Sequence, residues 1–345
     1  HLVAEVWRGI FVEVHADGPR SHGRVDGGVD VADEVRGIFE VDGRVLVDAI
    51  REASNELVGT GLTASSEEVT ALANGGPRKV SLDYKKPLSA DVFNVTSDNI
   101  NTEGDVGNME GGSYSVQRLD LNYAWGTTDL TQIVTQYGRQ GDIYAGIAGY
   151  QNAVTKSLMS SALKGVKAKL ATNAAITKAV ATDFDMQVVF DQVATAEEWA
   201  ASFKIMIVSH GRYAKLQGQN VNGFVPASQT LSHFDEYKGY ILLKSNTHTD
   251  NDVTVARTGA LAYGEGTAQQ AFEVERRANA ANGGGADILH ARFSRVIHPL
   301  GMDFKGAIAT TPAQVKSILE AAASWDKVAP DAQFGFRFIQ FNKTA

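Results

Sequence analysis

The stretch from Gly259 to Gly301 reads GALAYGEGTAQQAFEVERRANAANGGGADILHARFSRVIHPLG and carries the most distinctive pattern in the chain. Its glycine pair, Gly264 and Gly266, lacks the third glycine of a dinucleotide-binding loop. The glycines at 283–285 follow a charged stretch that we interpret as helix or loop, whereas a nucleotide-binding loop follows a strand. These glycines therefore do not indicate a nucleotide site.

The charged residues of this stretch are Glu273, Glu275, Arg276 and Arg277. Such a run is typical of a solvated surface, and the alternative is a contact with another subunit. Arg276 and Arg277 are therefore candidates for a subunit interface.

Composition excludes several classes of protein. The 345 residues suffice for two domains or one large one. The absence of cysteine excludes disulfides, zinc–thiolate sites, iron–sulfur clusters and thiol catalysis. The formal net charge of −8 argues against sequence-specific DNA binding. No apolar run approaches the ~20 residues that span a bilayer, so we expect a soluble, unsecreted chain with no membrane partner.

Catalytic and metal-binding motifs are missing from the sequence. It contains no GxxxxGK[ST], GxSxG or HExxH motif, and no pair among its eight histidines has HxH spacing. The five later histidines fall in different expected elements: His210, His233, His248, His290 and His298. We therefore expect no catalytic residues, no metal site and no cofactor.

The N-terminal third predicts an arm followed by a long β-hairpin. Residues 1–45 are expected to form a loose arm, the alternatives being a distinct domain or a misassigned stretch, with short helices over Val45–Leu57 and after the capping sequence Ser65-Ser-Glu-Glu68. Strand-like segments occur at 79–84, 91–96 and 114–124, around a polar, glycine-rich stretch. A two-stranded ribbon of this length has too little core to stand alone, so it must lie on something else.

A long helix is predicted next, because apolar residues recur at helical spacing up to Leu170. Its stripe consists of Ile143, Ile147, Tyr150, Val154 and Leu158, which we expect to pack under a sheet. Further helices are expected over 186–193, from Ser209 to Leu216 and from Thr311-Pro312 to about Ala323, with strands at 204–208, 240–243, 253–256 and 334–341.

Four segments, in their order and spacing, resemble one group of tailed-bacteriophage major capsid proteins: 259–266, 272–276, 281–289 and 296–301. The final helix, Trp325 and the aromatic last strand are similar to the ending of those proteins. The resemblance is strongest over residues 204–345.

The resemblance implies an α+β chain with the Hong Kong 97 type capsid fold, consisting of an N-terminal arm, a long β-hairpin called the E-loop, a long spine helix, and peripheral and axial domains. The expected boundaries are 1–76 for the arm and short helices, 77–126 for the hairpin, 127–216 for the peripheral domain with its spine helix, 217–295 for the axial domain and 296–345 for the return to the peripheral domain.

The resemblance also implies a structural function without catalysis. Such a protein self-assembles as hexamers and pentamers into the icosahedral shell that encloses phage double-stranded DNA without sequence-specific binding. The implied partners are a scaffolding protein, a portal and possibly a decoration protein. The implied location is the virion capsid, after assembly in the host bacterial cytoplasm.

Two details of assembly follow as hypotheses. The acidic hairpin residues Glu103, Asp105 and Glu110 would meet a basic strip on the adjacent subunit, with Arg276 and Arg277 as candidates. Some relatives join a hairpin lysine covalently to a neighbour's asparagine. Here the lysines at 79, 85 and 86 lie at the hairpin base, away from its tip, so we expect no such link.

Two alternative functions stay open at this point. One is an encapsulin-like nanocompartment shell, and the other is a cytosolic α/β enzyme with a histidine and carboxylate site. Electron microscopy would distinguish the three as DNA-filled shells, protein-filled shells or no shells.

Overall fold

The computed structural model describes residues 60–85, 93–99, 101–108, 111–131, 139–218, 223–230, 234–245 and 248–342. All of them belong to one compact unit, Asp42–Ala345. The expected arm over 1–45, the expected helix over 45–57 and Glu110 lie outside the described residues, as do the side chains of residues 139–145 and 148.

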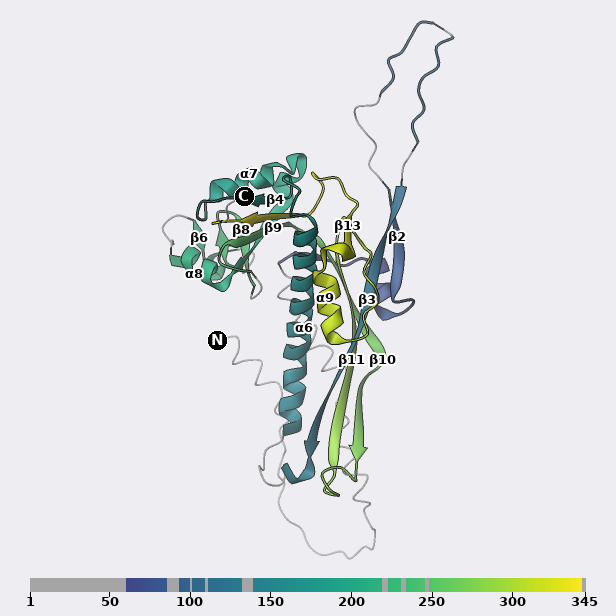
Figure 1. Ribbon diagram of the computed structural model, residues 1–345, viewed down its shortest axis with the longest axis vertical. Helices are drawn as coiled ribbons and strands as arrows, with labels where there is room; N and C mark the ends of the chain where they lie inside the picture. Colours follow the sequence, from purple (N-terminus) through teal and green to yellow (C-terminus); the bar gives the residue numbers. More distant parts are fainter. Residues whose placement is uncertain are drawn as a thin grey trace, which may run out of the picture. The chain divides into compact units, whose positions relative to one another are not determined.

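A five-stranded sheet, here called the long sheet, has the strand order β1-β10-β11-β3-β2 (Figure 1). Its central feature is β3, which has two different partners along its length. The first seven residues of β3 pair antiparallel with β2, from Lys85↔Gly111 to Lys79↔Gln117, and the next eleven pair antiparallel with β11. The bounds are β1 (Thr63–Ala64), β2 (Lys79–Lys85), β3 (Gly111–Thr128), β10 (Leu261–Arg277) and β11 (Ala286–Pro299). The structure therefore confirms the base of the predicted hairpin, where β2 pairs with β3. The second strand of the hairpin, β3, then continues alongside β11.

Helix α6 (Arg139–Lys169) covers one face of the long sheet, in contact with β11 and β3. Its 31 residues correspond to about 46 Å. Ile147 is fully buried and packs with Leu289 of β11, with Trp125, Phe272 and Val274 around them. The prediction that this stripe packs under a sheet is confirmed at Ile147.

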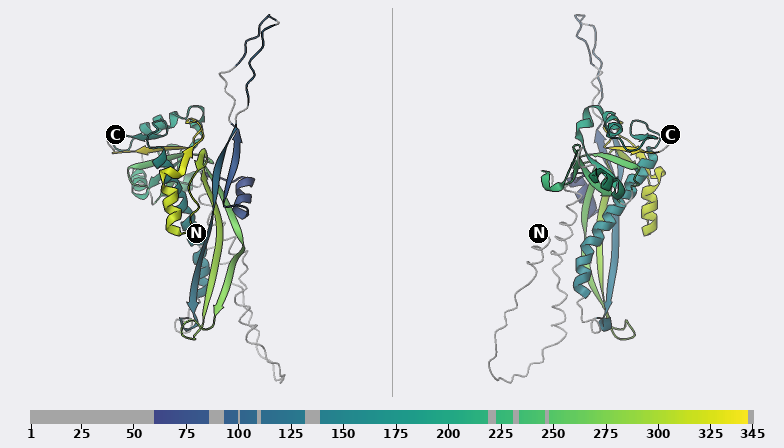
Figure 2. Two further views of the ribbon diagram at one scale, coloured as in Figure 1. Left: turned by 45° about the vertical axis from the view of Figure 1, so that its right-hand side comes forward. Right: turned by 90° about the vertical axis from the view of Figure 1, so that its left-hand side faces the viewer.

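Helix α4 (Glu67–Asn74) covers the other face at one end of the long sheet. Its N-cap is Ser66, whose Oγ accepts from the Val69 amide at 3.2 Å, as the capping sequence predicts. Val69 packs against Val296 of β11, which is seven residues from Leu289 and so points to the opposite face. The two views in Figure 2 show α4 and α6 on different sides of these strands.

Gly264 and Gly266 are explained by this helix. A Cβ at Gly266 would lie 1.9 Å from the Ala73 carbonyl oxygen, and one at Gly264 would lie 2.6 Å from that of Val69. The glycine pair that resembles part of a nucleotide loop therefore allows the backbone of α4 to lie directly on β10.

The second large sheet has seven strands in the order β4-β14-β9-β5-β8-β7-β6. Helices α7 and α8 pack on it, and Ser209 caps α8 as predicted, its Oγ accepting from the Arg212 amide at 2.9 Å. The bounds are β4 (Thr177–Ala179), α7 (Met186–Ala194), η2 (Glu197–Ser202), β5 (Phe203–Ser209), α8 (His210–Gly218), β6 (Phe224–Val225), η4 (Ala227–Gln229), β7 (Glu236–Tyr237), β8 (Tyr240–Ser245), β9 (Asp252–Arg257) and β14 (Phe336–Gln340).

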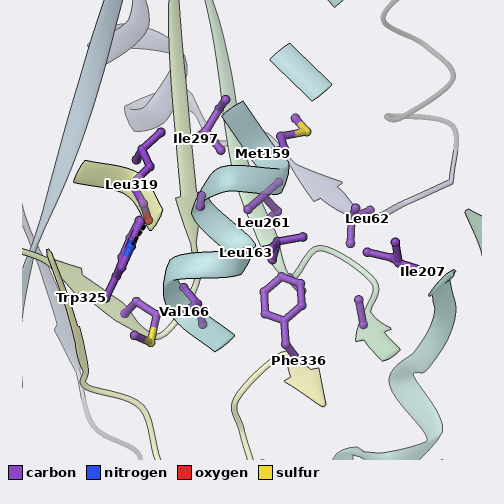
Figure 3. Packing of buried hydrophobic residues seen from close by; sticks show 14 of the residues in the cluster. Leu62, Met159, Leu163, Val166, Ile207, Leu261, Ile297, Leu319, Trp325 and Phe336 are labelled. Carbon is purple, nitrogen blue, oxygen red and sulfur yellow. Dashed lines mark hydrogen bonds between the residues drawn. The ribbon is translucent and has the colours of Figure 1, made fainter. Parts of the chain in front are cut away.

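The largest core cluster lies where α6, both sheets and the C-terminal helix α9 (Pro312–Glu320) meet (Figure 3). Thr311 caps α9, as predicted. Trp325 is the largest fully buried side chain, and its Nε1 donates to the Leu319 carbonyl at 2.8 Å. Trp325 begins β13 (Trp325–Lys327), which pairs with β12 (Met302–Phe304), and η5 (Ala322–Ser324) precedes it.

Two expectations differ from the structure. The described part of the segment 91–96 forms no strand, and the charged run 272–277 is part of β10, neither helix nor loop. The expected domain boundaries stay a prediction; in the described residues β5 pairs with β8 and β9 across position 216, and β10 and β11 pair within the long sheet. Sheets join strands that are distant in the chain, so composition along the sequence does not reveal which strands pair.

Candidate interaction surfaces

The hairpin tip has two limbs, 93–97 and 102–108, that are joined by one side chain. Asn94 Nδ2 donates to the Asp105 carbonyl at 2.8 Å, and the Asp105 amide donates to Asn94 Oδ1 at 3.2 Å. In the described part of the limbs no backbone ladder connects them. A Cβ at Gly104 would lie 2.8 Å from Asn94 Nδ2, so the absence of a side chain there leaves room for this clamp.

The tip exposes apolar side chains that sequence reasoning overlooked. Phe93 is 76% exposed, Val95 82% and Val106 91%. Glu103 and Asp105, the predicted acidic residues, are also exposed and form no ion pair within the described ranges. The alternation Phe93-Asn94-Val95 could have indicated two apolar side chains on one face of the limb, but the residues around it are mostly polar.

Arg276 is bound within its own chain. Its guanidinium donates to both carboxylate oxygens of Asp129, at 2.7 and 2.5 Å, and to Asp287 at 3.0 Å. These hydrogen bonds lower the pKa of Asp129. Gly285 has φ +84°, and a Cβ there would lie 2.5 Å from Arg276, so the glycine run in the β10–β11 turn makes room for this pair.

Arg277 is also paired in its own chain. It donates to Glu275 at 2.7 Å, and His290 lies 3.0 Å from the same carboxylate. The hydrogen bonds from Arg277 and His290 lower the pKa of Glu275 to about 2. Both arginines therefore carry partners in their own chain that the sequence did not predict, and their contact with the acidic tip of an adjacent subunit stays a prediction.

One edge of β3 is open along the part that pairs with β11. The Arg118 amide donates to the Arg78 carbonyl, on the β2 side, at 2.7 Å. Alternate residues direct their backbone groups to the same side, so those at 120, 122, 124 and 126 point away from β11. Among the described strands none pairs with that side of β3 beyond residue 118.

An aromatic cluster lies beside this open edge. The ring centroids of Tyr123, Trp125 and Tyr150 are 5.0 to 5.5 Å apart, and Tyr123 is 52% exposed. Burial and the neighbouring Tyr123 raise the pKa of Tyr150. Tyr150 was predicted only as part of the helix stripe, and the cluster depends on β3 lying against α6.

The best-buried histidine has a structural environment. His298 donates from Nε2 to the Met302 carbonyl at 2.8 Å and stacks on Tyr114 of β3, with ring centroids 5.3 Å apart. Burial lowers its pKa to about 4, so it is neutral near pH 7. Across the residues that the structure describes, no group of three His, Asp or Glu side chains could hold a metal ion.

Neither a membrane-spanning helix among the described residues nor a sequence relative points to a function for these surfaces. None of the described helices combines the length and apolarity needed to cross a membrane. No protein-family model matches the sequence, and no curated protein is significantly similar to it.

Solved structures do match. The capsid of Ralstonia phage GP4 superposes with a TM-score of 0.52 at 11% identity, over 70% of this chain and 83% of that one. Microbacterium phage Oxtober96 matches at a TM-score of 0.48 and 11% identity, over 82% and 90% of the two chains. The satellite phage P4 procapsid, including its size determination (Sid) protein, matches at 0.48 and 10% identity, over 91% and 98%.

The superposition on the Ralstonia phage GP4 capsid establishes the fold. This chain has the α+β capsid fold of the Hong Kong 97 type, and the fold prediction is confirmed.

Proposed function

We propose that this chain is a major capsid protein that self-assembles into the icosahedral shell of a tailed bacteriophage around double-stranded DNA. The observation that carries the proposal is a capsid fold whose hairpin tip exposes Phe93, Val95 and Val106 in a segment without a core of its own. Large apolar side chains exposed together mark a contact surface.

The fold suits a permanent closed assembly. Interfaces of several thousand Å² hold obligate assemblies together without any single strong contact. Closed shells repeat the same contact by symmetry, as in hexamers and pentamers. The long sheet with α6 would form the peripheral domain and the seven-stranded sheet the axial domain.

The acidic balance is consistent with a container for DNA. With a net charge of −8, the subunits hold DNA by enclosing it, since strong phosphate binding by every subunit would hinder packaging and release. The partners in this proposal are copies of the chain, a scaffolding protein, a portal and possibly a decoration protein. Assembly would take place in the host cytoplasm, and the protein would have no catalytic activity.

The charged candidates contribute at the edges of the subunit contact. Glu103 and Asp105 are exposed and would face the neighbour, as would Glu110. Arg276 and Arg277 are about half exposed but already paired, so any contact with a neighbour is shared with their present partners. Exposed ion pairs contribute only about 0.2 to 1 kcal/mol, so apolar and backbone contacts would dominate.

Electron microscopy of the purified chain, expressed with its scaffold, tests the proposal. We expect closed shells, DNA-filled in virions. Protein-filled shells would indicate a nanocompartment, and a chain that stays a ~37 kDa monomer under all conditions would refute shell formation.

A loop deletion tests the contribution of the hairpin. Replacing residues 93–108 by a short glycine linker leaves β2 and β3 paired, and should yield a folded subunit that fails to form stable shells. If this variant assembles like the natural chain, the hairpin is not a subunit contact.

A further inference from the structure

We propose that Asn282, in the turn that joins β10 to β11, is a modification site at which the folded chain converts its own asparagine to aspartate and isoaspartate. The turn lies at the end of the long sheet, where β10 and β11 meet (Figure 1). This inference does not depend on the proposed shell function. It concerns a change that each subunit undergoes once and irreversibly after folding.

The reaction requires only water. The backbone nitrogen of Gly283 attacks Cγ of Asn282, so that a bond forms between these atoms while the Cγ–Nδ2 bond breaks. Nδ2 leaves as ammonia and takes the proton that the Gly283 nitrogen loses. Water then opens the resulting ring: breaking the new N–Cγ bond gives aspartate, and breaking the original peptide bond gives isoaspartate, in which the backbone runs through Cγ. One water is consumed, one ammonia is released, and no group is oxidised or reduced.

The sequence contains three pairs in which glycine follows asparagine: Asn74-Gly75, Asn222-Gly223 and Asn282-Gly283. Asparagine is a thermally labile residue, and a following glycine has no Cβ to obstruct attack by its own nitrogen. Asn222 lies outside the described residues, so the structure compares the other two pairs. Asn74 and Asn282 are both exposed, so access to water does not distinguish them.

Asn74 is held by hydrogen bonds on both reacting groups. Its Nδ2 donates to the Thr70 carbonyl at 2.9 Å, and its Oδ1 accepts from the Thr267 amide of β10 at 3.2 Å. The nucleophile itself is engaged, because the Gly75 amide donates to the Ala71 carbonyl at 3.1 Å as α4 ends. All three bonds oppose the attack of Gly75 on Asn74.

Asn282 has no such restraint. Within the described ranges, neither its side-chain amide nor the backbone amide of Gly283 has a hydrogen-bond partner. The turn is closed instead by the Gly285 amide, which donates to the Ala280 carbonyl at 3.0 Å. The left-handed backbone of Asn282, with φ +57°, explains why asparagine suits this position. Both reacting groups are therefore free to meet after rotation about the bonds of Asn282.

Modification would change both the charge and the length of the turn. Aspartate and isoaspartate each add a negative charge, and isoaspartate inserts one extra atom into the backbone that the bond from Gly285 to Ala280 closes. The Gly285 carbonyl also accepts from the Asp129 amide at 3.2 Å, and Asp129 is the partner of Arg276. Conversion would therefore act beside a charged pair at the end of the long sheet.

Peptide mapping by mass spectrometry tests the site in the full-length, unassembled chain. The folded chain is incubated in mildly alkaline water enriched in heavy oxygen, and the peptide that contains Asn282 should take up one labelled oxygen and separate into two products. At about fivefold for each net hydrogen bond, the three bonds around Asn74 should make it react on the order of 100-fold more slowly.

Asn279 is a matched control in the same turn. It is also exposed, but it precedes Ala280, whose Cβ obstructs attack and whose amide donates to the Arg277 carbonyl at 3.2 Å. Asn279 should therefore stay unmodified while Asn282 converts.

The denatured chain separates the effect of structure from that of sequence. In guanidinium chloride the hydrogen bonds around Asn74 are lost, so Asn74 and Asn282 should convert at similar rates. The variant Asn282→Gln lengthens the side chain by one carbon, which disfavours ring closure, and should remove the label from its peptide.

The expected result is conversion of Asn282 ahead of Asn74 in the folded chain and similar rates after denaturation. Equal rates in the folded chain, or an Asn282 that stays intact there and converts only when denatured, would overturn the proposal. A label that persists in Asn282→Gln would also overturn it, since the reaction would then lie elsewhere. These measurements need no shells, so a failure of shell assembly bears only on the proposed function.

Discussion

Gly165 lies where α6 crosses the C-terminal helix, and replacing it by alanine should destabilise the fold. In an open helix this change is favourable by about 1 kcal/mol, because alanine loses less backbone entropy. Here a Cβ would lie 2.0 Å from the Leu319 carbonyl oxygen and 2.6 Å from Trp325 Nε1. Those two atoms form the hydrogen bond that holds the buried indole.

The magnitude follows from three contributions. Overpacking of a tight core costs about 1 to 3 kcal/mol. Weakening the bond from Trp325 to the Leu319 carbonyl costs about 1 to 2 kcal/mol more. After subtracting the helix preference of alanine, we expect Gly165→Ala to lower the free energy of unfolding by about 1 to 4 kcal/mol.

Gly149→Ala on the same helix provides the matched control. Gly149 is exposed, and a Cβ there meets no atom within 4 Å, so this change should leave stability equal or raise it by up to about 1 kcal/mol. Urea unfolding of the unassembled subunits, followed by circular dichroism, measures both. If Gly165→Ala is as stable as Gly149→Ala, the close crossing of α6 over α9 is wrong.

Further predictions address the core, pH dependence and covalent chemistry. Ile147→Ala should cost about 2 to 4 kcal/mol in urea unfolding, and Ile147→Asp, which buries an unpaired carboxylate, should prevent folding; soluble, helical Ile147→Asp chain would show that the site faces solvent. Because the pKa of His298 falls from about 6.5 to about 4 on folding, the unfolded chain binds the proton first, so stability is complete above pH 6.5 and falls by about 3 kcal/mol as the pH approaches 4. His248 has a similarly lowered pKa, so His298→Gln should remove roughly half of the combined pH dependence, and an unchanged slope would contradict the assignment. Boiled, denatured particles should run as single subunits, since Lys79 lies against Gly306 and Phe304 of its own chain; ladders from the natural chain would refute this.

Local signals in the sequence predicted local structure. The sequences Ser65-Ser-Glu-Glu68 and Thr311-Pro312 were expected to begin helices, and Ser66 and Thr311 each accept a hydrogen bond from a backbone amide at a helix start. These caps depend on only three or four consecutive residues, so no knowledge of the tertiary fold was required. The period of the apolar stripe likewise sufficed to predict that Ile147 is buried.

In the segment 272–277 the high density of charge concealed the alternating pattern of a strand. Phe272 and Val274 alternate with Glu273 and Glu275, which is the period of a strand with one solvated face. The density of charge suggested a helix or loop, although cross-strand pairs such as Arg292 with Glu273, at 2.8 Å, satisfy these charges on the sheet surface. The alternation was the better guide.

The candidate site required tertiary information. The contact of Arg276 with a neighbour stays a prediction; within its own chain, Asp129 and Asp287 reach it from segments that only the fold brings together. The aromatic cluster likewise combines β3 with α6. No spacing in the sequence relates these partners, because their proximity depends on strand pairing and helix packing.

The continuity of β3 has a mechanical consequence. A tension on the hairpin, directed along β3, would pass directly into the eleven residue pairs that β3 forms with β11. The hydrogen bonds of an antiparallel ladder lie perpendicular to the strands, so such a pull shears all of them together and does not peel them apart one at a time. A pressurised wall built from this subunit would therefore carry lateral stress through a ladder loaded in its most resistant direction.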